Sequence, residues 1–513
     1  MVKKEIFLLP QSLPLDEFLE KMTPVYSFQK EPALTENQTF YDTFDWRLFQ
    51  NRLTLIQNDS EFRLCKLSDE QVIRKLRWTS TTTPRFWSDF PAGAFQTKLQ
   101  ALLTVRAIIK LVTVVRQIQP VNILNTDQKI VLKVHFETIR LKNDSENGEI
   151  AQLAKVQPLR GYQIELEAFK KFGQNAGWTV NTEPIFITVL RATGKEPGAY
   201  SSKLQIPLKP EMSAKEATIT VLKHLHSVIR QNEDGIKHDI DTEFLHDFRV
   251  AIRRTRSALS QMKAIFPKEI IRQYKQNFAY LGQLTNHSRD LDVYLLKQDQ
   301  YRNMLPDHLK VGLDPLFKAL KNERKAEYKK LVEALFGTTY QQMMQSWQDF
   351  LNSPSPSLSE ELKNADKPIL AVAQKFIYKR FLKVIKIGNQ IDPDTPDKEL
   401  HQLRINCKKL RYLIEFFASL FPSNKIGLMI KQLKMLQDNL GDYNDFHVQQ
   451  EKLLTFMENN IRSEKDFVKV SAAIGGLITQ LNQRQLEIRQ QFEQTFSEFS
   501  KPKNVKIFQE LFG

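Results

Sequence analysis

A pattern of basic residues occurs twice in this chain, and the two copies lie 155 residues apart. The first copy spans Leu245–Arg256 and the second spans Leu400–Arg411. The same offset continues beyond the pattern, where it relates Asp290 to Asp445. A repeat of this length indicates an internal duplication, and equivalent helices of a duplicated protein are commonly related by a pseudo-twofold axis. We therefore expect the two copies to face a shared site.

The basic residues of each copy fall on one face of a helix. Positions i, i+3, i+7 and i+10 lie within an arc of about 80° when each residue turns the helix by roughly 100°. We call these two groups the cationic ridges: His246, Arg249, Arg253 and Arg256 form the first, and His401, Arg404, Lys408 and Arg411 form the second. Apolar residues such as Phe248 and Leu403 occupy the adjoining sector and predict packing within a helical bundle. Arg254 and Lys409 leave the ridges and flank them, which widens the basic surface.

The ridges carry almost no compensating negative charge of their own. Within 245–264 the only acidic residue is Asp247, and within 400–420 it is Glu415. A solvated basic helix face is usually offset by Glu one turn away, whereas an uncompensated ridge repels itself until a counter-charge binds. Arginine suits phosphate because its planar guanidinium donates two parallel hydrogen bonds. These observations predict a polyanionic ligand.

Each ridge begins with a histidine, which is open to two interpretations: a structural side chain with a local hydrogen bond, or a ligand-binding group. A neutral imidazole can donate a hydrogen bond to a phosphate oxygen, and neighbouring cations disfavour its protonation. Metal binding is not predicted, because no second His, Cys or carboxylate follows at i+3 or i+4 on the ridge. We therefore expect neither a metal nor a cofactor.

The composition limits the partners and the location of the protein. The chain has 513 residues, a formal net charge of +15 and a pI near 9.4, which indicate anionic partners such as nucleic acid, a membrane surface or phosphate polymers. Its two cysteines, Cys65 and Cys407, provide no disulfide framework. The longest apolar stretch, 101–118, is interrupted by three basic residues, and the N-terminal apolar run is too short for a signal peptide. We expect a cytoplasmic protein without a membrane span.

Strand-like alternation of apolar and polar residues is confined to the N-terminal part. It predicts strands at Lys129–Glu137 and Tyr162–Ala168, the second with Glu165 and Glu167 on one face. Breaks at 206–213 and 352–357 separate this part from long helical stretches. We predict an α+β multidomain protein: an antiparallel, tunnel-like β domain with helices at 1–205, followed at 211–510 by an all-α domain of two pseudo-symmetric helical bundles, about 211–350 and 360–510.

The duplicated pattern resembles the signature of the CHAD family, His-x-x-Arg-(hydrophobic)-x-x-Arg/Lys-Arg/Lys-x-Arg. The segments Leu281–Val293 and Lys434–Asp445 are also similar to that family, so the resemblance covers about 211–510. It implies two helical bundles around a basic surface or pore that binds inorganic polyphosphate, association with polyphosphate granules, and no established catalytic activity. The binding residues that we predict are the two ridges together with Arg254, Lys409, Arg289 and Lys434.

The N-terminal part resembles the CYTH triphosphate-tunnel family. Phe40–Leu48 is similar to that family's Tyr-Tyr-Asp-Thr segment, and Glu165 with Glu167 to its later Glu-x-Glu strand. The family's opening Glu-x-Glu-x-Lys motif corresponds here to Glu5, Phe7 and Leu9, so two of its three residues are apolar. Hydrolysis of a triphosphate needs carboxylates that hold a divalent metal. Glu165 and Glu167 remain only weak candidate ligands, and we predict a degenerate tunnel in a protein that is not an enzyme.

Two other functions are compatible with the sequence. The first is a metal-dependent triphosphatase in the N-terminal part, and the second is RNA or DNA binding by the basic surface. Proteins that bind nucleic acid usually interleave aromatic side chains for base stacking, and the first ridge has none. Tyr412 adjoins the second ridge, but Ser257 stands at the equivalent position of the first. Polyphosphate has no bases, so purely cationic ridges favour it as the ligand.

Overall fold

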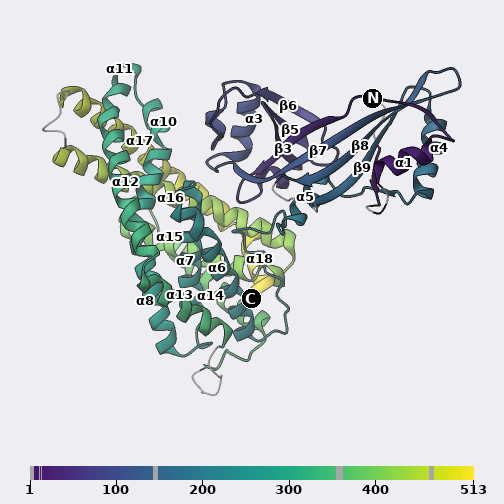
Figure 1. Ribbon diagram of the computed structural model, residues 1–513. Coiled ribbons are helices and arrows are strands. Elements are labelled where there is room, and N and C mark those ends of the chain that lie inside the picture. Colours follow the sequence, from purple (N-terminus) through teal and green to yellow (C-terminus); the bar gives the residue numbers. More distant parts are fainter. Residues whose placement is uncertain (1–4, 11, 13, 143–147, 354–361, 461–466) are drawn as a thin grey trace. The chain divides into compact units, whose positions relative to one another are not determined.

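The computed structural model describes residues 5–10, 12, 14–142, 148–353, 362–460 and 467–513, which form two units, 1–201 and 202–513 (Figure 1). The first unit combines an antiparallel sheet with short helices, and the second contains only helices. This arrangement confirms the predicted α+β multidomain fold class. Of the break predicted at 352–357, only Asn352 and Ser353 are described, and helix α13 ends at Asn352.

The N-terminal unit is built on a ten-stranded sheet with the order β10-β1-β9-β8-β7-β3-β4-β5-β6, in which β2 also pairs with β7. All of the paired strands are antiparallel. The strands are β1 (Glu5–Leu9), β2 (Ser27–Lys30), β3 (Leu34–Asp42), β4 (Leu53–Asn58), β5 (Glu61–Lys66), β6 (Val72–Arg77), β7 (Ile109–Leu124), β8 (Ile130–Leu141), β9 (Glu149–Pro158) and β10 (Thr179–Val180). The helices are α1 (Leu15–Met22), α2 (Arg47–Gln50), α3 (Ala94–Leu103), α4 (Gln163–Asn175) and α5 (Ile185–Ala192). The strand predicted at Lys129–Glu137 is confirmed from Ile130 on, where β8 begins.

The strand predicted at Tyr162–Ala168 is wrong, because this segment begins helix α4. Leu166, Phe169 and Gly173 are the buried residues of α4, and their spacing of three and four is that of a helix face. A short alternating run is compatible with either structure, and the apolar residues further along decide for the helix. Glu165 and Glu167 therefore point about 200° apart instead of sharing a face. Glu167 is exposed and pairs with Lys170 at 3.1 Å.

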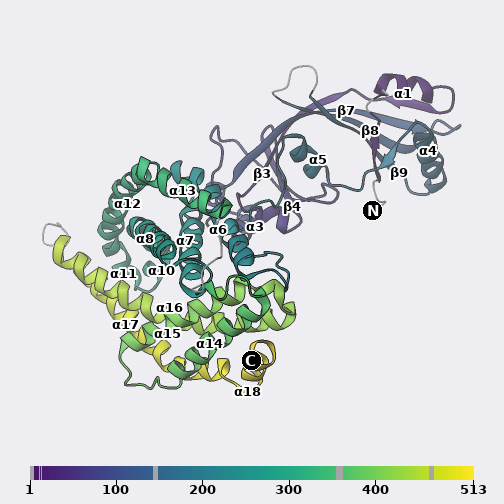
Figure 2. The ribbon, with the colours of Figure 1, turned by 90° about the horizontal axis from the view of Figure 1, so that it is seen from below.

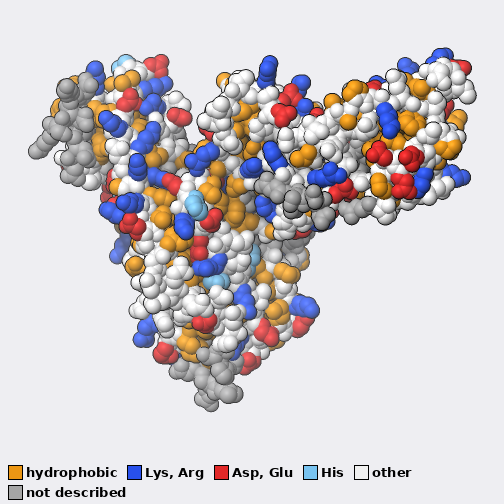
Figure 3. Space-filling model, viewed as in Figure 1, with side chains coloured by type: hydrophobic (Ala, Val, Ile, Leu, Met, Phe, Trp, Pro, Cys, Tyr) orange, Lys and Arg blue, Asp and Glu red, His pale blue; other side chains and the backbone are white. Residues whose placement is uncertain are grey.

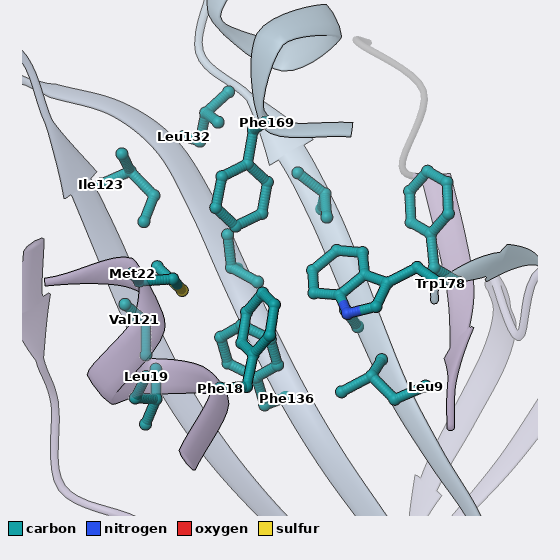
Figure 4. Close-up of a cluster of buried hydrophobic side chains, with 14 of the residues drawn as sticks. Leu9, Phe18, Leu19, Met22, Val121, Ile123, Leu132, Phe136, Phe169 and Trp178 are labelled. Atoms are coloured by element: carbon teal, nitrogen blue, oxygen red, sulfur yellow. The ribbon is translucent and has the colours of Figure 1, made fainter. Parts of the chain in front are cut away.

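The apolar side chains of β1 lie in the core of the N-terminal unit. Phe7 and Leu9 are buried against residues of α1, α4, β7, β8 and β9 (Figure 4). Phe18 of α1 lies 4.9 Å from Trp178 and 5.6 Å from Phe136, measured between ring centroids. Burial of such large rings is the main source of stability for this part of the sheet. Phe7 and Leu9 correspond to the second Glu and the Lys of the Glu-x-Glu-x-Lys motif, and here both side chains pack in the core instead of carrying charge.

A buried cluster of four charges neutralises itself inside the N-terminal unit. Glu70 lies in the turn between β5 and β6 and reaches Arg116 on β7, with N–O distances of 3.1 and 3.2 Å, and Lys155 on β9, at 2.8 Å. Glu137 on β8 lies 3.3 Å from the Arg116 Nε and 3.2 Å from the Lys155 Nζ. Burial alone would raise the pKa of Glu70, but the charges of Arg116 and Lys155 hold this pKa well below its usual range. The stabilisation by Glu70 is therefore present above the pKa of an unfolded glutamate and is lost as the pH falls.

Replacement of Arg116 by Met is expected to leave Glu70 and Glu137 buried beside a single lysine, which should lower the free energy of unfolding of this unit by about 3–5 kcal/mol. Urea unfolding followed by tryptophan fluorescence measures this change, because four of the five tryptophans lie in this unit. Arg140→Met is the control, since Arg140 pairs with Glu149 on the surface of the same sheet and should change stability by less than about 1 kcal/mol. Equal losses in both variants would contradict a stabilising role of the buried cluster.

The helical unit preserves the duplication in three dimensions. Its helices are α6 (Ala214–Lys237), α7 (Thr242–Gln261), α8 (Lys268–Leu284), α9 (Asn286–Leu296), α10 (Gln298–Asn303), α11 (Asp307–Lys310), α12 (Asp314–Leu335), α13 (Thr338–Asn352), α14 (Ile369–Gly388), α15 (Asp397–Phe416), α16 (Ser423–Asn460), α17 (Phe467–Phe499) and α18 (Pro502–Phe512). Helices α6, α7 and α8 begin 155 residues before α14, α15 and α16, respectively. The two sets of helices lie beside each other in the bundle (Figure 2).

A reciprocal pair of hydrogen bonds marks the pseudo-twofold relation between the two copies. The backbone N–H of Ala214 donates to the carbonyl of Lys367, and that of Ile369 donates to the carbonyl of Met212, both at 2.8 Å. Each bond is the other one moved by 155 residues, as expected for an isologous contact. No helix within the described residues combines the length and apolar character that crossing a membrane would require.

Candidate functional site

The two cationic ridges lie on α7 and α15, which pack against each other. The predicted apolar sectors are buried: Phe248 on α7 and Leu403 on α15 are fully enclosed. Arg253 and Lys408, which are equivalent in the repeat, are close enough for the charge of Arg253 to help lower the pKa of Lys408. A residue that neighbours its own equivalent lies near the axis relating the copies. The two ridges therefore meet near the pseudo-twofold axis.

In the first ridge, Arg249 is held by the junction of α8 and α9. Its Nη1 donates to the Gly282 carbonyl at 3.1 Å and to the Thr285 Oγ1 at 2.6 Å, and its Nη2 donates to the Asn286 Oδ1 at 2.7 Å. The break between the helices at Thr285 makes these acceptors available. Burial is the largest cause, and the charge of Arg253 the next, of a lowering of the pKa of Arg249 to about 10. The guanidinium is thus fixed in place and still carries its charge at neutral pH.

The second ridge lacks this support, although it is equivalent in sequence. Leu440 and Gly441 replace Thr285 and Asn286, and α16 continues through the position where the first copy breaks. Arg404 instead pairs with Asp445, with an Nη2–Oδ1 distance of 3.3 Å. The first ridge therefore holds its arginine through hydrogen bonds, and the second holds it by a single longer ion pair.

The histidines at the head of the ridges have equivalent neighbours. Arg289 donates from its Nη2 to the Nδ1 of His246 at 3.0 Å, and Asn444, which is equivalent to Arg289, contacts the Nδ1 of His401 at the same distance. A guanidinium only donates, so the Nδ1 of His246 accepts and the ring proton lies on Nε2. Arg289 also donates to the Thr242 carbonyl at 3.1 Å. Arg289 thus positions His246.

Two of the predicted basic residues share a carboxylate that connects α7 to α15. Glu415 accepts from the Arg254 Nη2 at 2.9 Å and lies 3.2 Å from the Arg411 Nε. Arg254 also donates to the Ser202 carbonyl at 2.7 Å. The basic surface therefore carries less uncompensated charge than its sequence indicates. Glu415 neutralises part of the charge of the flanking Arg254 and of Arg411 at the end of the second ridge.

Lys409 faces another part of the unit. The pKa of Lys409 is lowered, mainly by burial. The charges of Arg380 and Lys383 on α14 and of Lys275 on α8 lower it further. Lys409 thus adjoins further basic residues of α14 and α8, and its predicted role in widening the basic surface stays a prediction. Lys434 is exposed on α16.

Part of the ridge charge remains uncompensated. Among the predicted binding residues, five side chains form neither an ion pair nor a hydrogen bond with the described part of the chain: Arg253, Arg256, Lys408, Lys409 and Lys434. Burial, followed by the charges of Arg404 and Arg253, lowers the pKa of Lys408 to about 8. Lys and Arg side chains are spread over the face of the helical unit shown in Figure 3, with exposed histidine side chains among them. An anion at the axis would relieve this repulsion.

Two acidic neighbours of the ridges were missed from sequence as parts of the site. Asp445 pairs with Arg404, and its equivalent Asp290 lies 3.1 Å from the Nζ of Lys452. The repeat offset relates these two aspartates, but it does not reveal which cations they face. Among the described residues, no group of three or more His, Cys, Asp or Glu side chains is arranged to hold a metal ion.

Glu415→Gln is expected to leave Arg254 and Arg411, both largely buried, without their shared counter-charge. The free energy of unfolding of the helical unit should fall by about 2 kcal/mol, measured by urea unfolding with far-UV circular dichroism. Glu510→Gln is the control, because Glu510 forms an exposed pair with Lys425. If the two variants are equally stable, Glu415 does not connect α7 and α15 in the way described.

Comparison with known proteins finds similarity in the helical part. Residues 220–454, which include both ridges, match the family model of the CHAD domain. The crystal structure of the CHAD domain from the plant Ricinus communis is 24% identical, covers 58% of this chain and 97% of its own, and gives a TM-score of 0.47. PptA from Streptomyces chartreusis is 13% identical, covers 55% of this chain and 99% of its own, and gives a TM-score of 0.41. No curated protein sequence matches this chain. Over residues 220–454, the helical unit is thus similar to the CHAD domain.

Proposed function

We propose that the helical part, about 211–510, binds inorganic polyphosphate through the two cationic ridges and catalyses no reaction. The observation that carries this proposal is the electrostatic interaction of Arg253 with Lys408 across the packed helices α7 and α15; these equivalent cations have no ion-pair partner among the described residues. Fixed like charges beside each other favour a ligand with closely spaced negative charges. Arg249 and Arg404, each one turn away, supply guanidinium groups suited to phosphate oxygens.

The symmetry of the site supports polyphosphate over a single nucleic-acid strand. A polyphosphate chain is the same in both directions, so its two halves can meet equivalent residues on either side of a pseudo-twofold axis. A nucleic-acid strand has a direction and cannot do so. Tyr412, the aromatic residue beside the second ridge, is buried with 6% of its surface exposed, and Arg411 lies over its ring. It is therefore not placed to stack on bases.

The N-terminal unit gives less support to a triphosphatase. Phe7 and Leu9 are in the core, and Glu5 is paired with Lys170 at 2.9 Å. The interior cations Arg116 and Lys155 are already neutralised by Glu70 and Glu137. The resemblance to CYTH stays a prediction about the origin of this unit, and we propose that the unit is not catalytic. The cellular location that we propose is the cytoplasm, on polyphosphate granules.

Charge reversal in either ridge is expected to weaken polyphosphate binding. Arg249→Glu with Arg253→Glu, and Arg404→Glu with Lys408→Glu, should each raise the Kd for long-chain polyphosphate by at least about tenfold at moderate salt. Filter binding or calorimetry across a salt series measures this change, and circular dichroism should show unchanged helicity, because these side chains lie off the apolar face.

The matched control reverses Lys275 and Lys383, two exposed lysines away from the ridges, which gives the same change in net charge. If this control weakens binding equally, the basic surface is general. If one ridge can be reversed without effect, the two ridges do not share a site.

The pKa of Lys408 predicts a pH dependence. Lys408 loses its proton as the pH rises through about 8, so binding should weaken between pH 7 and 9.5 by roughly threefold to tenfold. Lys408→Arg stays charged and should remove most of this change. Parallel pH profiles for the wild type and Lys408→Arg would contradict a contribution of Lys408 to binding.

A further inference from the structure

Two equivalent aspartates bring negative charge to the ridges from other helices. Asp290 lies on α9 and Asp445 on α16, 155 residues apart, and both side chains are 49% exposed. Asp445 pairs with Arg404 of the second ridge at 3.3 Å. Asp290 opposes the lowering of the pKa of Arg249, the equivalent arginine of the first ridge. Each aspartate therefore acts on the same ridge position of its own copy.

Lysines of the opposite copy lie near both aspartates, one in direct contact and one in a shared cleft. Asp290 lies 3.1 Å from the Nζ of Lys452 on α16. Lys297, which is equivalent to Lys452, lines a cleft of about 770 Å³ together with Asp445. The residue pairs Asp290–Lys452 and Asp445–Lys297 are equivalent under the 155-residue offset of the repeat. Asp290 thus supplies negative charge across the boundary between the copies.

These pairs are poorly suited to stabilising the fold. Half-exposed ion pairs are screened by water and salt and add little to the free energy of unfolding. Their charges nevertheless oppose the repulsion within the ridges, since Asp445 acts to raise the pKa of Lys408 against the effects of Arg404, Arg253 and Arg411. An approaching polyanion would meet the same cations and would be repelled by the two carboxylates. The main energetic effect of the aspartates therefore falls on the ligand.

We propose that Asp290 and Asp445 are internal counter-ions of the cationic ridges, which a polyanion displaces when it binds. They set the affinity of the site below the value that the ridges alone would give, and they keep binding reversible at moderate salt. The identity of the displacing polyanion rests on the proposed function. The electrostatic role of the aspartates is independent of it.

The test uses the full chain with Asp290→Asn, Asp445→Asn and both together. Each single variant should tighten the binding of long-chain polyphosphate by roughly threefold to tenfold at low salt, and the double variant by the product of the two. The plot of log K against log salt should become steeper, because the freed cations recruit counterions that the ligand must release. Unchanged or weaker binding would overturn the proposal.

Asp349→Asn is the matched control, with the same change in net charge. Asp349 is exposed on α13, which packs against α6 and α12, and it accepts a hydrogen bond from the Nε2 of Gln345 on the same helix at 2.9 Å. This variant should bind as the wild type does. If Asp349→Asn tightens binding as much as the ridge variants, net charge alone explains the effect and the proposal is wrong.

A second readout needs no ligand and separates this inference from the proposed function. Lys408, which Arg404, Arg253, Asp445 and Arg411 face, should titrate at a lower pH in Asp445→Asn than in the wild type, and not in Asp349→Asn. NMR of lysine side chains labelled with ¹³C, assigned with Lys408→Arg, measures this pKa. If the wild type fails to bind polyphosphate but the pKa of Lys408 falls in Asp445→Asn, the proposed ligand is wrong and the role of the aspartates as counter-ions is supported. If this pKa does not change, the counter-ions are excluded whatever the ligand.

Discussion

The helical unit depends on the packing of α7 against α15, which holds two equivalent cations beside each other. Arg253 and Lys408 would separate in a flexible chain, because like charges repel. They stay together since the adjoining faces of their helices are apolar and buried, as Phe248 and Leu403 are. The favourable free energy of apolar packing thus offsets the repulsion between the two cations. This repulsion persists at the pseudo-twofold axis. That repulsion is what a bound polyanion would relieve.

The charges around the axis divide into those satisfied by the fold and those that are not. Glu415 neutralises Arg254 and Arg411, and the α8–α9 junction holds Arg249 through neutral acceptors. Neutral acceptors fix a guanidinium without cancelling its charge, so Arg249 is both positioned and available to an anion. The second copy has lost this junction, and Arg404 relies on a half-exposed aspartate. The two halves of the site are therefore equivalent in position but differ in rigidity, a difference that a flexible linear ligand can accommodate.

The duplication and the helical structure of 242–261 and 397–416 could be predicted from the sequence, because helical periodicity is a local property and a fixed offset can be read directly from the residues. The strand predicted at Tyr162–Ala168 failed, since a short alternation does not distinguish a strand from a helix whose buried face continues to Gly173. The partners of Arg254, Arg249 and Arg404 could not be predicted. They come from residues distant in sequence, such as Ser202 and Glu415 for Arg254, and only tertiary packing brings them together.

The most direct test of the shared site is its stoichiometry. Isothermal titration calorimetry of the full chain with an oligophosphate of defined length, just long enough to span both ridges, measures the number of sites per chain. A single site across the axis predicts one oligophosphate per chain, with binding lost when either ridge is reversed in charge. Two oligophosphates per chain with independent affinities, or no binding at all, would contradict a common site formed by the two copies.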